Sequence, residues 1–217
     1  MRNCKIPKNK TARRLLPIAC AALTMSFTAS LALADQVTQP PVPTKIQVPA
    51  GNKAFLKGHA TGTQNYICLP DGTGFKFVLF TPQATLFDED DKQIITHFFG
   101  PNPDPAEPGA IRAAWQYRDT STVWGGVVQP SSDPNFVDPD AIPWLLIERK
   151  GSADGPTGGH KLTGTTFIQR VNTSGGVAPE TDCETEADVG GKAFVPYTAD
   201  YFFYKKARKY DDGHGNY

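Results

Sequence analysis

The side chains able to do chemistry in this 217-residue chain are few and scattered. Its histidines (His59, His97, His160 and His214) are isolated, with no H-x-H pair and no adjacent glutamate, so their spacing does not favour a metal site. The motifs of a serine nucleophile, a zinc-binding helix and a glycine-rich phosphate loop are also absent. We therefore predict no cofactor and no metal.

His97 is the histidine best placed for binding, because it lies near the end of an expected strand that leads into the proline-rich loop 100–109. A rigid loop costs little ordering entropy on binding. His97 would add a group that changes charge near neutral pH, and Trp115 a stacking face. We predict a ligand site that contains His97, Trp115, Tyr66 and Gln64. Alternatively, Trp115 fills the core, and a half-exposed His97 bonds to the backbone at a turn.

A carboxylate beside His97 would allow a second function, that of a secreted hydrolase or lyase. Glu148 and Asp200 are the carboxylates expected on strands rather than in turns. Each is also explained as a strand charge near Arg149 or Arg170. No catalytic residue is assigned from the sequence.

Residues 1–34 have the order of a cleaved signal peptide: a basic opening, an apolar run from Leu15, and Ala32-Leu33-Ala34 before Asp35. This predicts a secreted or periplasmic protein. No later segment is apolar enough for a transmembrane helix. Removing six basic leader residues leaves 16 Lys and Arg against 22 Asp and Glu, a net charge near −6. That charge disfavours nucleic acid as a partner.

Two cysteines, Cys68 and Cys183, remain after the leader is removed. In an oxidising compartment an even pair predicts one disulfide, here between an early strand and a loop near the end of the domain. The alternative is two free thiols. Neither cysteine is adjacent to a basic residue in the sequence, so nothing indicates a reactive thiolate.

The rest of the chain divides into a proline-rich extended segment (35–50), a β domain (51–205) and a polar tail (206–217). Short runs rich in aromatic and β-branched residues, bounded by Gly, Pro, Asn and Asp, predict a single all-β domain. The expected strands are 53–60, 63–69, 75–81, 93–99, 110–118, 122–129, 143–149, 162–171 and 193–204. They would form an antiparallel sandwich or a closed barrel with long proline-rich loops. Aromatics on both faces of 193–204 predict a strand covered on both sides.

Seven separated segments resemble one exported family of bacteria and fungi, known as domain of unknown function 3455. In order, they are Gly62–Cys68, Pro82–Leu86, His97 with Gly100-Pro101, Ile142–Leu146, Ile168–Thr173 with Gly175-Gly176, Ala178-Pro179 with Cys183, and Val195–Tyr197 with Asp200, Tyr201 and Tyr204. The resemblance implies a secreted, β-rich domain without an established activity. The absence of a nucleophile or metal motif and the surplus of aromatics favour a binding or structural protein at or outside the cell envelope. Its partner would be a small molecule or a surface polysaccharide, and its oligomeric state stays open.

Overall fold

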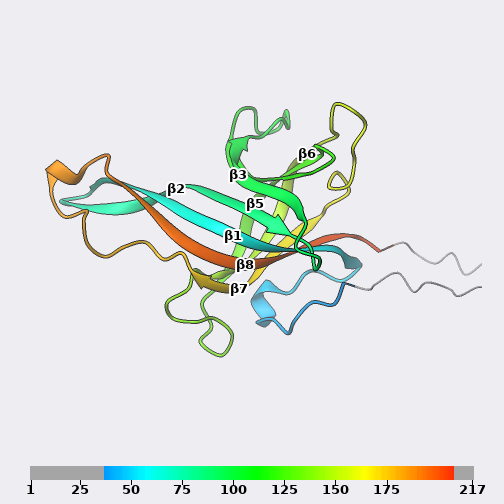
Figure 1. Cartoon of the computed structure of the whole chain (residues 1–217), viewed down its shortest axis with the longest axis horizontal. Coiled ribbons are helices and arrows are strands. Elements are labelled where there is room, and N and C mark those ends of the chain that lie inside the picture. Colours follow the sequence, from blue (N-terminus) through cyan, green and yellow to red (C-terminus); the bar gives the residue numbers. More distant parts are fainter. Residues whose placement is uncertain (1–36, 208–217) are drawn as a thin grey trace, which may run out of the picture. The chain divides into compact units, whose positions relative to one another are not determined.

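Eight antiparallel strands, taken in chain order, close into a barrel (Figure 1). They are β1 (Asn52–Asp71), β2 (Gly74–Phe87), β3 (Gln93–Pro101), β4 (Ile111–Tyr117), β5 (Thr122–Ser131), β6 (Trp144–Ala153), β7 (Phe167–Gly175) and β8 (Lys192–Lys206). The computed structural model describes residues 37–207, so the predicted signal peptide and most of the predicted polar tail lie outside the described residues. The all-β prediction is confirmed, and the architecture is the closed barrel rather than the sandwich.

The barrel closes where the first strand pairs with the last. β1 and β8 pair from Asn52–Lys206 to Ile67–Lys192. The two strands predicted at 53–60 and 63–69 are one continuous strand, because Gly62 does not turn the chain. A Cβ on Gly62 would lie 2.1 Å from the carbonyl oxygen of Gln83, so the glycine permits a close approach of β2 to β1.

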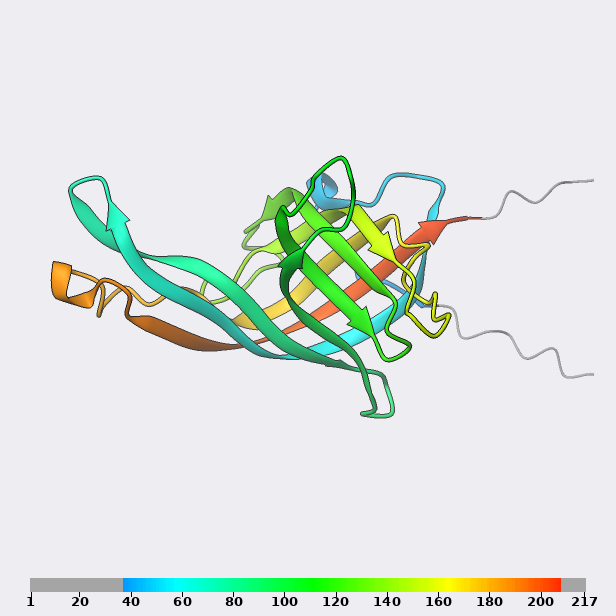
Figure 2. The same cartoon turned by 90° about the horizontal axis from the view of Figure 1, so that it is seen from above.

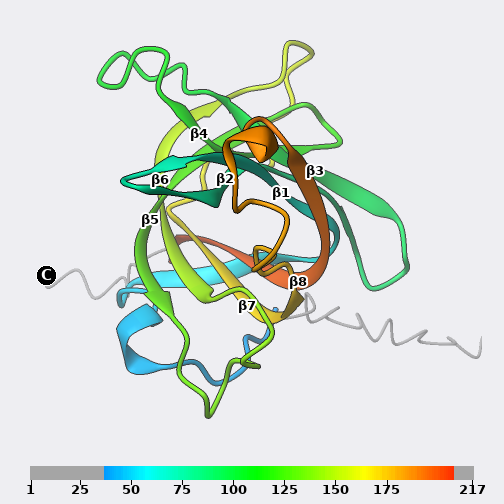
Figure 3. The same cartoon turned by 90° about the vertical axis from the view of Figure 1, so that its left-hand side faces the viewer.

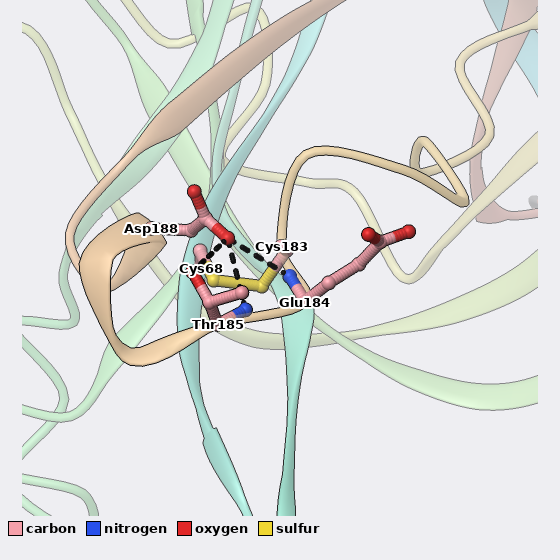
Figure 4. Close-up of a disulfide and its surroundings, with 5 residues drawn as sticks. All are labelled: Cys68, Cys183, Glu184, Thr185 and Asp188. Carbon is pink, nitrogen blue, oxygen red and sulfur yellow. Dashed lines mark hydrogen bonds between the residues drawn. A yellow bond between two sulfur atoms is a disulfide. The ribbon is translucent and has the colours of Figure 1, made fainter.

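β1, β2 and β8 continue past the other strands as a three-stranded arm (Figure 2). Cys68 of β1 and Cys183 of the β7–β8 loop lie there at disulfide distance, with their Cα atoms 5.5 Å apart (Figure 4). The backbone bonds Cys68 N–H to Gly191 O (2.8 Å) and Gly190 N–H to Cys68 O (3.0 Å) hold the same junction. The predicted link between an early strand and a late loop is therefore present.

The inside of the barrel is packed with apolar side chains at the end away from the arm. Leu86, Val123, Ile168 and Phe203 point inward there and are fully buried. Leu162, in the β6–β7 loop rather than in the predicted strand 162–171, is also fully buried and joins this cluster. These contacts close one end of the barrel.

A second apolar cluster covers part of the outer face of the barrel. Ile46 of the short 3-10 helix η1 (Thr44–Ile46) is fully buried against Trp144, Phe202 and Tyr204. Figure 3 shows η1 outside the barrel wall. The proline-rich segment is therefore packed on the domain, and its contacts bury the outer face of β8 at Phe202 and Tyr204. The prediction that 193–204 is covered on both faces holds only for this end of β8, because Phe194 in the arm is 60% exposed.

A cavity in the barrel as the candidate functional site

A cavity of about 220 Å³ opens into the barrel at the end that carries the β3–β4 loop (102–110). All eight strands contribute to its wall. Its outer part is apolar and includes Leu79, Ile111 and Val127, which are 41%, 62% and 58% exposed. The barrel is therefore packed with side chains at one end and has a cavity at the other. Eight-stranded barrels of this kind can hold one small ligand.

His97 lies in the wall of this cavity, in the middle of β3. Its side chain is 3% exposed, and its Nδ1–H donates to the carbonyl oxygen of Ala114 at 2.9 Å. The expected backbone bond is therefore present, but the histidine is buried inside the barrel rather than half-exposed at a turn. Burial lowers the pKa of His97 to about 3, aided by the charge of Arg170, so His97 stays neutral instead of changing charge near neutral pH.

Trp115 stacks directly on His97 across the β3–β4 pair. The ring centroids are 4.3 Å apart and the planes differ by 9°. Trp115 is 1% exposed and meets Tyr201 and Phe203 edge-on, so it belongs to the core and lines the cavity at once. Among the described residues, its Nε1–H has no hydrogen-bond acceptor. A buried donor without an acceptor is costly to folding.

The other two residues of the predicted site have different positions. Gln64 is 2% exposed and lines the cavity with His97 and Trp115. Tyr66 does not line it: its hydroxyl donates to the carbonyl oxygen of Gly176 at 2.6 Å. A β-bulge between Asn65 and Tyr66 separates the two positions, which strict alternation would have placed on one face.

Arg170 of β7 is a charged cavity residue that the sequence analysis did not place in the binding site. It lines the cavity, and its Nε–H and one Nη2–H donate to the carbonyl oxygen of Pro143 at 3.2 and 2.9 Å. No carboxylate within the described chain forms an ion pair with it. A signal was available: in alternation it shares a face with Ile168, which points into the barrel.

The carboxylates considered for catalysis lie on the other side of the barrel wall from His97. Glu148 follows the inward-facing Ile147 and pairs with Lys150 at 2.8 Å. Asp200 precedes the inward-facing Tyr201, and its carboxylate meets Nδ1 of His59 at 2.6 Å. The structure therefore brings neither carboxylate to His97.

The proline-rich loop is fixed beside the cavity mouth by Asn102, which is 2% exposed. Its Nδ2 donates to Glu107 and to the carbonyl oxygen of Lys150, both at 3.2 Å. Glu107 also pairs with Arg112 at 2.9 Å, which lowers the pKa of Glu107. These polar contacts attach the loop to β4 and β6.

A family model described as "Protein of unknown function (DUF3455)" matches residues 49–205, which span β1 to β8. The chain belongs to this family. The match confirms the resemblance found in the sequence, and every cavity-lining residue of this DUF3455 chain lies within it. No curated protein and no solved structure matches the chain.

The described part of this DUF3455 chain has neither a cluster of metal-ligating side chains nor a membrane-spanning helix. Its residues contain no group of three or more His, Cys, Asp or Glu side chains that could hold a metal ion. No helix within residues 37–207 has the length and apolarity needed to cross a membrane.

Proposed function

We propose that this chain is an exported binding protein that takes a small ligand, apolar over most of its surface, into the barrel. The observation that carries the proposal is the cavity itself, to which all eight strands contribute. Ligand sites are typically concave and mostly apolar, with a few placed polar groups. Export is supported by the leader sequence and by the cysteine pair at disulfide distance.

A small molecule suits this site better than a surface polysaccharide. Of the four aromatic rings expected to stack on a sugar or an apolar ligand, Trp115 and Tyr66 are 1% and 9% exposed, and Tyr117 and Trp124 are partly buried. A polymer chain cannot lie across rings that are inside the protein. The volume also sets a scale, because a 150 Å³ apolar cavity accommodates benzene. A cavity of about 220 Å³ therefore suits a one-ring or short-chain compound.

The test is a thermal shift assay with one-ring and short-chain compounds, on the wild type and on two phenylalanine variants. Ala113 lines the cavity, so Ala113→Phe should fill it and abolish the shift. Ala106 is exposed in the β3–β4 loop, so the matched variant Ala106→Phe should keep it. Ligand at 100 times its Kd stabilises the folded state by about 2.7 kcal/mol, or roughly 5–10 °C for a domain of this size. The proposal fails if no compound shifts the wild type, or if Ala113→Phe responds equally.

A further inference from the structure

We propose that the ligand carries a single carboxylate, which Arg170 binds inside the barrel. This inference rests on the proposed function and names the chemical class of its ligand. It depends on the two arginines that line the cavity, Arg112 and Arg170, and on the absence of acidic side chains from the cavity lining.

The two arginines differ in whether their charge is already balanced. Arg112 donates two hydrogen bonds to the carboxylate of Glu107, at 3.0 and 2.9 Å. Within residues 37–207, the Arg170 side chain donates only to the carbonyl oxygen of Pro143, which carries no formal charge. Of the two, Arg170 alone is thus left without a counter-charge among the described residues.

Arg170 also keeps donors for a ligand. A guanidinium has five N–H groups, and two of those in Arg170 go to the Pro143 carbonyl. Three therefore remain without a protein acceptor in the described chain. The bonds to Pro143 hold the planar group in place, so a carboxylate could be bound with little further loss of side-chain freedom.

The positive charge acts on the surrounding polar groups. It adds to the effect of burial in lowering the pKa of His97. At Tyr66 and Tyr197 burial raises the pKa of the hydroxyl, and the charge of Arg170 opposes that rise. No carboxylate is among the groups that influence these three side chains. Arg170 therefore places a positive charge in a cavity wall whose described residues include no acidic side chain, although the chain without its leader has a net charge near −6.

The rest of the cavity determines how the ligand would lie. The exposed outer residues Leu79, Ile111 and Val127 are apolar, whereas Arg170, His97 and Gln64 are polar. The carboxylate would bind at the polar part, and the ring or alkyl chain would contact the apolar outer part. One cation balances one negative charge, so a monoanion is favoured over a phosphate dianion.

The first experiment compares acids with their neutral amides by isothermal titration calorimetry on the wild type. The probes are benzoate, phenylacetate and hexanoate, each against its primary amide, with phenyl phosphate added as a dianion. We expect at least one acid to bind about 30-fold or more tightly than its amide, and more tightly than phenyl phosphate. Equal binding of acid and amide would overturn the proposal that the ligand carries a carboxylate but leave the proposed function intact. Binding of none of the probes would overturn both.

The second experiment assigns the effect to Arg170. In Arg170→Gln the preference for the acid should disappear, while Arg170→Lys should keep part of it because the charge remains. Arg149→Gln is the matched control, since Arg149 is exposed and lies outside the cavity lining. Loss of the Pro143 contact could alter the fold, so a variant counts only if its melting is cooperative. An acid preference that persists in Arg170→Gln contradicts the assignment. If Arg170→Gln does not fold, an acid preference that Arg170→Lys leaves undiminished contradicts it instead.

Discussion

Removing the bond between Cys68 and Cys183 should lower the free energy of unfolding by several kcal/mol. The two residues are 115 positions apart in sequence. In the chain-entropy model a loop of that length corresponds to about 5 kcal/mol at 25 °C, and native disulfides typically contribute about 2–5 kcal/mol. We expect the loss of unfolding free energy to fall in the lower part of this range. The backbone hydrogen bonds between Cys68 and residues 190 and 191 can persist in the arm without the disulfide.

Urea unfolding of the double variant Cys68→Ala/Cys183→Ala, followed by tryptophan fluorescence and far-ultraviolet circular dichroism, measures this change. Cys68 is fully buried, so alanine there also removes packing. Reduced wild-type protein, which keeps both side chains, separates the cross-link from that packing. The two probes must give coincident transitions for the free energy to be defined. A loss below about 1 kcal/mol on reduction, or two thiols that alkylate in the folded oxidised protein, would refute the reasoning.

Three further predictions concern the packed segment, the buried histidine and the leader. Ile46→Ala should cost about 2–5 kcal/mol in urea unfolding, because Ile46 is fully buried, whereas exposed Lys45→Ala should change little. The unfolded chain protonates His97 below about pH 6.5 and the folded barrel only near pH 3, so the wild type should lose stability as the pH falls. Between pH 7.5 and pH 5, the wild type should lose about 2 kcal/mol more unfolding free energy than His97→Gln. Parallel curves of unfolding free energy against pH for the two proteins would contradict a buried neutral histidine. Exported protein should begin at Asp35 by intact mass, and a mass that retains residues 1–34 would contradict the cleavage site.

Strand periodicity was informative for the end of the last strand. The alternation and aromatic content of 193–204 predicted a strand covered on both sides, and Tyr201 and Phe202 are indeed buried on opposite faces of β8. Proline and glycine residues indicated where the long loops are. The even number of cysteines indicated that Cys68 and Cys183 are linked. These features depend on neighbours in sequence or on simple counting, and single-sequence reasoning can use both.

Features that depend on contacts between distant segments were not predictable in the same way. Gly62 resembles a turn residue until β2 is seen to lie against it, with the Gln83 carbonyl 2.1 Å from where a Cβ would be. Ile46 lies in a proline-rich segment without any period, and its burial depends on Trp144 and Phe202, which come much later in the chain. His97 was placed near a loop because it is close to one in sequence, whereas β-sheet pairing puts it against Trp115.

Arg170 shows most clearly why closing the barrel matters for function. Along β7 it is the only charged residue, and Asp200 of the neighbouring strand β8 would be its obvious partner from the sequence. The registers instead pair Arg170 with Tyr201 and direct Asp200 to His59 on the other side of the wall. A partly buried cation without a counter-charge is unfavourable for folding, and an apolar side chain in its place would avoid that cost. Departures of this kind from the rules of stable packing are expected at functional sites, and here the departure occurs in the wall of the cavity.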